Sequence, residues 1–150
     1  GSVGFFWTAS FQQIYRELAK LEEQAWIKAE KIAQDHRPDK RLYALTTAGQ
    51  EELARWIGEA DKPAPIKDDL LVKIYAGSIV PKATIAAKIL AYRDRCQERL
   101  AIYRAIEQAH FATPQDLPAV DRFPYLTLRF GIHYETSQLA WCEEAIAFLA

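Results

Sequence analysis

The chain has 150 residues, of which half are hydrophobic and about a quarter are charged, and its formal net charge at pH 7 is -1. This composition is that of a globular protein, and it excludes both a disordered chain and a polycation that coats nucleic acid through bulk charge. Charged residues interrupt every apolar run before it could cross a bilayer, so we expect no membrane contact and a cytoplasmic location.

A helix is predicted to begin after Ser10, because Ser10 and Gln13 have the spacing of a capping box, in which each side chain satisfies a free backbone N–H of the other. Downstream, apolar residues recur every three or four positions and form one stripe: Phe11, Ile14, Leu18, Leu21 and Ala25. The opposite face is polar and includes Gln12, Gln13, Arg16 and Lys20. The helix is therefore expected to be amphipathic, with its polar face toward solvent.

Two short runs, residues 26–32 and 41–46, contain β-branched and aromatic residues and flank a polar turn with Pro38, which predicts a β-hairpin. Its tip is basic, with His36, Arg37, Lys40 and Arg41 opposed only by Asp39. A following helix should be capped by Thr46 or Thr47, and Gln50 has the capping-box distance from Thr47. We expect that helix to bury Leu53, Trp56 and Ile57 and to end near Gly58.

Pro63 and Pro65 cannot continue a helix, so the domain boundary is placed after residue 60. Residues 61–150 predict a short helix opened by Asp68 and Asp69 and a long helix from Pro81 to about His110. A last helix is expected after a Pro-rich break over residues 113–124. The long helix carries an approximate heptad of Ile85, Ile89, Tyr92, Cys96, Tyr103 and Ile106, interrupted by Arg99.

The last helix carries two apolar stripes. One contains Leu128, Ile132, Leu139, Cys142, Ile146 and Leu149, interrupted by Glu135, and the other contains Tyr134, Trp141, Ala145 and Phe148. One stripe suffices for packing within the chain, so a helix with two is expected to bury one against a second chain. The residues predicted to form this dimer contact are Leu128, Ile132, Leu139, Trp141, Cys142, Ile146 and Leu149.

The order helix, basic hairpin, helix is that of a winged helix-turn-helix from its recognition helix onward. Glutamine can pair with adenine and arginine with guanine, so Gln12, Gln13 and Arg16 are candidate base readers. Ser10 and Tyr15 could donate to phosphate, and the predicted electrostatic contacts are Lys20, Lys31, His36, Arg37, Lys40 and Arg41. The alternative for the hairpin tip is an ordinary solvated turn, because short polar turns are common.

Several blocks of sequence together resemble the PadR family of transcriptional regulators. They are Ser2 to Trp7, Gln13 to Leu18 with Leu21 to Glu23, Arg37 to Tyr43 with Leu45 and Thr46, and Gly49. Tyr125 and Leu126, His133 to Glu135 and Leu139 to Leu149 are similar to the dimerisation region of the longer members. The resemblance covers essentially the whole chain.

The resemblance implies a mainly α fold: a winged helix-turn-helix over residues 1–60, with one hairpin wing and without its first helices, and an α-helical dimerisation domain over residues 61–150. It further implies a homodimer that binds a palindromic operator, usually as a repressor. Some members are released from DNA by phenolic acids or hydrophobic drugs. A dimeric helical module that binds another protein, without binding DNA in this form, is the alternative function.

A small aromatic effector is a further expectation, because aromatic side chains that could line its pocket are present: Trp7, Tyr103, Phe130, Tyr134 and Trp141. The same residues could equally be core. The sequence contains no Gly-rich phosphate loop, nucleophile motif or acid–base pair, so we expect no enzyme. Neither the two cysteines nor the three histidines have metal-ligand spacing, and no cofactor is expected.

Overall fold

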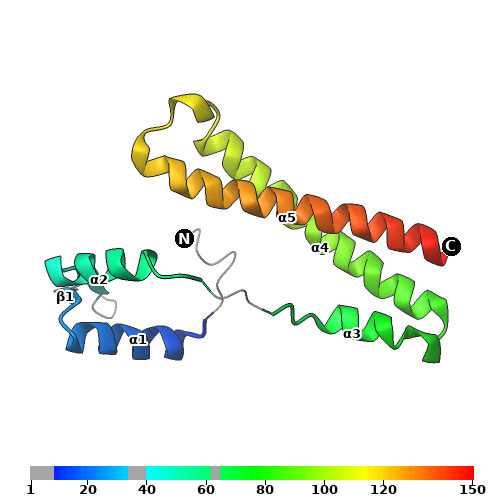
Figure 1. Ribbon diagram of the computed structural model, residues 1–150, viewed down its shortest axis with the longest axis horizontal. Coiled ribbons are helices and arrows are strands. Elements are labelled where there is room, and N and C mark those ends of the chain that lie inside the picture. The colour runs from blue at the N-terminus through cyan, green and yellow to red at the C-terminus, as the bar shows by residue number, and fades with distance from the viewer. Residues whose placement is uncertain (1–8, 34–39, 62–64) are drawn as a thin grey trace. The chain divides into compact units, whose positions relative to one another are not determined.

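The computed structural model describes residues 9–33, 40–61 and 65–150, and the chain divides into two compact units, residues 1–64 and 65–150. The first unit contains helix α1 (Phe11–Glu23), strands β1 (Ile27–Ile32) and β2 (Lys40–Leu45), and helix α2 (Thr47–Ile57) (Figure 1). The second contains α3 (Asp69–Tyr75), the 3-10 turns η2 (Gly77–Ile79) and η3 (Pro114–Asp116), and the long helices α4 (Lys82–His110) and α5 (Ala119–Leu149). The prediction of a mainly helical chain with one hairpin is confirmed.

Helix α1 begins with the predicted capping box. The backbone N–H of Gln13 donates to Ser10 Oγ at 3.2 Å, and the backbone N–H of Ser10 donates to Gln13 Oε1 at 2.8 Å. The helix ends in a tight turn, where the Trp26 N–H donates to the Leu21 carbonyl at 2.9 Å. Ala25 occupies the left-handed region there, with φ of 55°. This turn directs the chain straight from α1 into β1.

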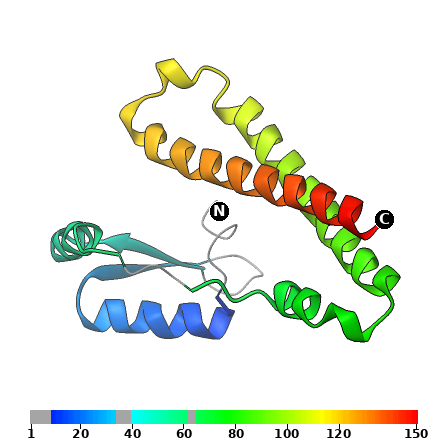
Figure 2. The ribbon, with the colours of Figure 1, turned by 45° about the vertical axis from the view of Figure 1, so that its right-hand side comes forward.

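The two strands form an antiparallel hairpin in which Ile27 pairs with Leu45 and Lys31 pairs with Arg41. Figure 2 shows the strands side by side, with α1 running along the hairpin. At the base of the hairpin, Thr46 Oγ donates to the Ala25 carbonyl at 2.7 Å and accepts the backbone N–H of Gly49 at 3.0 Å. A Cβ on Gly49 would lie 1.9 Å from the Trp26 carbonyl oxygen, so only glycine fits at this contact.

The predicted cap of α2 is confirmed at Thr46, whose backbone is extended and whose hydroxyl accepts the N–H of Gly49, the third residue of the helix. The expected buried face of α2 is wrong. The expected apolar face is exposed at Leu53, Trp56 and Ile57. Among the described elements α2 packs against β2, and a two-stranded hairpin is too narrow to cover an entire helix face.

The second unit is organised by α4 and α5, which pack against each other as a helical hairpin (Figure 1). Two apolar clusters lie in this seam. The first is built on Ile85, Ile89 and Cys142, with Trp141, Ala145, Ile146 and Leu149 packed around them. The second is built on Leu100, Tyr103 and Ile132, with Leu128 and Leu139 packed against them. Asp68 caps α3 through its side chain, as predicted, by accepting the backbone N–H of Leu70 at 2.7 Å.

The residues that interrupt the predicted heptad of α4 and the predicted apolar stripe of α5 meet each other in this seam. Arg99 Nε lies 3.1 Å from Glu135 Oε1, and Glu135 is only 2% exposed. Its second oxygen, Oε2, has no hydrogen-bond partner among the residues that the structure describes. The neighbouring Cys96 thiol has its pKa raised to about 11 by burial and by the Glu135 carboxylate. Because sliding one helix along the other would leave the buried Glu135 carboxylate without Arg99, this contact favours the observed register of α4 against α5.

Helix α5 begins earlier than predicted, at Ala119, and Pro124 lies inside it. A proline near the start of a helix removes only one backbone hydrogen bond, so the predicted Pro-rich break is shorter than residues 113–124. None of the helices in the described parts of the chain is long and apolar enough to span a membrane.

Candidate nucleic-acid interface

The polar residues predicted to face solvent on α1 are exposed in the structure. They are Ser10, Gln12, Gln13, Tyr15, Arg16 and Lys20. The capping box occupies the Gln13 carboxamide oxygen with the backbone of Ser10. Gln13 is therefore held at the start of the helix, whereas Gln12 is exposed without such a contact among the described residues. The helix presents donors and acceptors suited to base edges along one exposed side.

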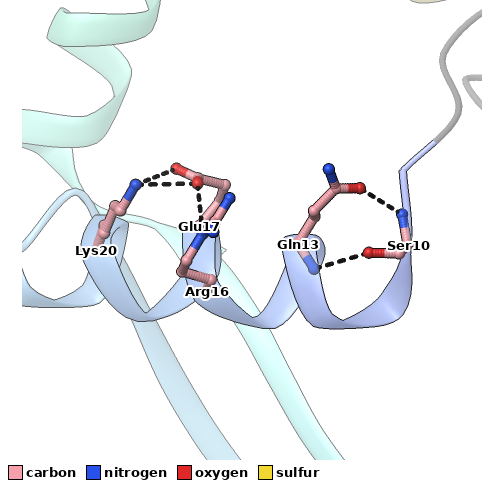
Figure 3. A network of polar contacts seen from close by, with 5 residues as sticks. All are labelled: Ser10, Gln13, Arg16, Glu17 and Lys20. Atoms are coloured by element: carbon pink, nitrogen blue, oxygen red, sulfur yellow. Dashed lines mark hydrogen bonds and ion pairs between the residues drawn. The ribbon is translucent and has the colours of Figure 1, made fainter.

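Arg16 and Lys20 are not isolated cations. The Glu17 carboxylate accepts hydrogen bonds from both (Figure 3). Arg16 Nε donates to Oε1 at 3.4 Å, and Lys20 Nζ donates to Oε1 at 3.0 Å and to Oε2 at 3.1 Å. The Lys20 hydrogen bond, followed by that of Arg16, lowers the pKa of Glu17, so its carboxylate is ionised at neutral pH. Two predicted DNA contacts thus share one carboxylate. Sequence reasoning missed Glu17, although its spacing of three residues from Lys20 is that of a helical ion pair.

The strand register divides the cations of the hairpin between its faces. Lys31 and Arg41 are directly opposite each other and share one face, whereas Lys40, which pairs with Ile32, lies on the other. His36 and Arg37, also predicted to bind DNA, lie outside the described residues. Lys31 and Arg41 therefore place two cations side by side on one face of the hairpin.

Arg41 also contacts two neighbours from its own unit. Its guanidinium lies 5.9 Å from the centroid of the Tyr43 ring, and Nη2 lies 3.9 Å from Glu22 Oε2. The second contact ties the hairpin to α1, because Glu22 belongs to that helix. The sequence did not predict the contact of Glu22 with Arg41, because a local sequence pattern does not indicate which residue 19 positions away a side chain will meet.

The stripe predicted to contact a second chain is in fact the stripe that packs within the chain. Ile132 and Cys142 are buried against α4, and the other five predicted residues, Leu128, Leu139, Trp141, Ile146 and Leu149, pack around them. Ile132 and Cys142 offer little surface to a partner because α4 covers them, and the contact of this stripe with a second chain stays a prediction. The exposed apolar residues of α5 are different: Val120, Phe123, Leu126, Phe130, Tyr134 and Phe148.

The predicted aromatic pocket is not assembled by the residues named for it. Tyr103 is buried between α4 and α5, and Phe130 and Tyr134 stack on the exposed face of α5 with ring centroids 6.3 Å apart. Trp7 lies outside the described residues. Trp141 lines a cavity of about 510 Å³, which is formed by α3, η2, α4 and α5. Tyr103, Phe130 and Tyr134 do not line it. Its lining is mainly aliphatic and includes one cation, Lys82, and one carboxylate, Glu144.

Comparison with known proteins identifies the chain. Residues 2–55 match the family model described as transcriptional regulator PadR-like family, and residues 66–150 match virulence activator alpha C-term. A Mycobacterium tuberculosis protein named "Probable transcriptional regulator Rv1176c" is 37% identical over 95% of this chain and 81% of its own length. The chain belongs to the PadR-like family of transcriptional regulators. It is a regulator of the longer type, in which a helical domain follows the winged helix.

Two regulators with solved structures resemble this PadR-like chain over nearly its whole length. The negative transcriptional regulator PadR of Bacillus subtilis is 28% identical over 98% of this chain and 82% of its own. Its crystal structure with operator DNA matches with a TM-score of 0.83 at 25% identity, covering 99% of this chain and 84% of that one. The Vibrio cholerae virulence activator AphA matches with a TM-score of 0.78 at 28% identity, covering 99% and 83%. The predicted winged-helix fold is thereby confirmed.

Proposed function

We propose that this PadR-like regulator binds operator DNA as a homodimer and represses transcription. The observation that carries the proposal is the exposed polar face of α1 with cations of the adjoining hairpin in the same unit. In a winged helix, the recognition helix lies in the major groove and the hairpin contacts the backbone. The Bacillus subtilis relative, a negative regulator crystallised with operator DNA, supports both parts. Such a regulator acts where the chromosome is, which is the cytoplasm of a bacterial cell.

In this proposal Gln12, Gln13 and Arg16 read base edges, while Ser10, Tyr15 and Lys20 bind phosphates near the helix. Lys31, Lys40 and Arg41 bind phosphates from the hairpin, and we extend this role to His36 and Arg37. The division predicts two kinds of mutant. Loss of a phosphate contact should weaken binding to DNA of every sequence. Loss of a base contact should instead change which sequence is preferred.

The surface proposed for dimerisation is the exposed apolar face of α5. Phe123, Leu126 and Phe130 are each more than 60% exposed there, and Phe130 stacks on Tyr134. Contiguous apolar surface of this kind marks an interaction site, and isologous pairing of two copies would cover it on both. A symmetric dimer presents two copies of α1, which matches a palindromic operator.

The test begins by selecting a duplex from a randomised pool with the full chain, and then measures affinity for that duplex and for a scrambled one. Arg41→Ala should weaken both alike and reduce the log–log salt slope by about 1. The matched control is Arg55→Ala, because Arg55 lies on α2 and is held by Glu52 and Glu59. No measurable binding of any duplex at low salt would contradict the proposal and favour a protein-interaction module.

Control by a small aromatic acid is a second part of the proposal, supported by the cavity near Trp141. The cavity has the volume of a small-molecule site and a mainly apolar lining with one cation, Lys82, and one carboxylate, Glu144. Bacillus subtilis PadR has been crystallised with p-coumaric acid, in a structure that is 26% identical, with a TM-score of 0.77, and covers 98% of this chain and 82% of that one.

Calorimetry with p-coumaric acid tests this site. Ala145→Leu should abolish binding, because Ala145 lines the cavity and the larger side chain would fill it. Lys82→Gln should weaken binding of the acid but not binding of its methyl ester. Only the acid carries a negative charge that Lys82 can pair with. Ala147→Leu, on an exposed position of the same helix, is the control. Equal binding to all three variants and the unmodified chain would place the ligand elsewhere or exclude this cavity.

A further inference from the structure

The carboxylate of Glu17 holds the two cations on the proposed reading helix. Its Oε1 atom accepts Arg16 Nε at 3.4 Å, and both of its oxygens accept Lys20 Nζ, at 3.0 and 3.1 Å. The three side chains are all more than half exposed. Figure 3 shows them as one continuous group that is separate from the Ser10 and Gln13 capping box.

The other two carboxylates of α1 are placed differently. Glu22 lies near Arg41 of the hairpin, 3.9 Å from its guanidinium. Glu23 is exposed and makes no ion pair or side-chain hydrogen bond with any other residue that the structure describes. Glu17 is therefore the carboxylate of this helix that neutralises the proposed DNA-binding cations of the same helix.

The pairing of Glu17 with Arg16 and Lys20 changes which contacts DNA must make in order to bind tightly. Non-specific binding comes almost entirely from cations that meet phosphates, and a carboxylate between those cations weakens their attraction and repels the phosphates. A guanine edge that bonds Arg16 directly would compensate for this repulsion, whereas a wrong base would not. Since exposed ion pairs contribute little to stability, removing the Glu17 charge should change DNA binding more than folding.

We propose that Glu17 is a specificity-determining residue, which restrains Arg16 and Lys20 and penalises DNA that offers only phosphates. This inference rests on the proposed function, because it takes α1 as the reading helix. Glu17 is a positioning and discriminating residue in this scheme, and it makes no contact of its own with a base. Discrimination here arises by weakening the wrong complexes more than the right one.

The test compares Glu17→Gln with Glu23→Gln, which remove the same charge from the same helix. The probes are the duplex selected by the unmodified chain and a scrambled duplex of the same composition. Glu17→Gln should tighten binding to the scrambled duplex roughly three- to tenfold, with a salt slope steeper by about 1 for each additional phosphate contact. Binding to the selected duplex should change less than about twofold, and Glu23→Gln should have effects of less than about twofold on both.

Two outcomes would overturn the inference. Equal tightening by the two variants would mean that only net charge matters. Weakening of the selected duplex alone by Glu17→Gln would mean that Glu17 itself contacts a base, for example by accepting a cytosine amino group. Absence of binding by the unmodified chain would instead contradict the proposed function. Circular dichroism and thermal unfolding of both variants verify that the helix is retained, and glutamine preserves helix propensity.

Discussion

The two units of this regulator differ in where their apolar side chains lie. In residues 65–150 the seam between α4 and α5 buries Ile85, Ile89, Cys96, Leu100, Tyr103, Ile132 and Cys142. In the described residues of the first unit, only Ile27 and Gly49 are buried. Among the described residues, side-chain burial is therefore concentrated in the second unit, whereas hydrogen bonds at the turns join α1, the hairpin and α2 in the first. Substitutions should act through different mechanisms in the two units.

The largest effect on stability is expected from Ile89→Ala in α4. Ile89 is 1% exposed in the cluster with Ile85 and Cys142, so truncation leaves a cavity in a packed seam. The loss should be about 2–5 kcal/mol in the free energy of unfolding. Chemical denaturation at fixed protein concentration measures it. Ile102→Ala, in an exposed position of the same helix, is the control, and a similar loss there would contradict a packing mechanism.

A smaller effect, specific to the first unit, is expected from Gly49→Ala. The added Cβ would lie 1.9 Å from the Trp26 carbonyl oxygen, and that atom also accepts the backbone N–H of Thr46. The backbone at the start of β1 must therefore shift, which should lower the free energy of unfolding by about 1–3 kcal/mol. Hydrogen exchange should show the loss in residues of the hairpin and α2. Gly58→Ala, where the nearest atom is 3.4 Å away, should be tolerated, and equal sensitivity at both glycines would disprove the close contact.

The smallest effect is a gain, from Ala25→Gly. Ala25 has φ of 55°, a conformation that costs residues with a Cβ roughly 1–2 kcal/mol and costs glycine nothing. Glycine loses more conformational entropy on folding than alanine, and this loss offsets part of the relieved strain. The free energy of unfolding should therefore rise by about 0.5–1 kcal/mol. The matched control is Ala54→Gly inside α2, where the same change should be destabilising by about 0.5–1 kcal/mol. A loss in both variants by thermal unfolding would show that Ala25 is not strained.

Local patterns were predictable where one or two side chains decide the structure. The Ser10 and Gln13 capping box, the Asp68 cap and the end of α4 near His110 depend on residues close in sequence, and each is present. The exposed polar face of α1 follows from helical periodicity in the same way. Candidate base-reading residues could therefore be named from their spacing, together with a resemblance to the PadR family.

Pairings between distant residues could not be obtained in this way. Arg99 was predicted only as an interruption of the α4 heptad and Glu135 only as an interruption of an α5 stripe, because nothing in either helix says that their positions coincide. The same limit applies to α5: two apolar stripes were recognised, but periodicity does not say which stripe faces α4, and only the structure shows Ile132 and Cys142 covered by that helix. Ala25 gave no signal either, since alanine favours helices and its left-handed conformation is imposed by the turn around it.

The sequence by itself determined the chain of elements, the polar face of α1 and the family, because caps, periodicity and motifs are local properties. The tertiary structure decided which face of α5 is covered, which cations share a face of the hairpin, and that Glu17 restrains Arg16 and Lys20. The reason is physical. A pattern limits which residues share a face, but only packing in three dimensions selects the neighbour that each face meets.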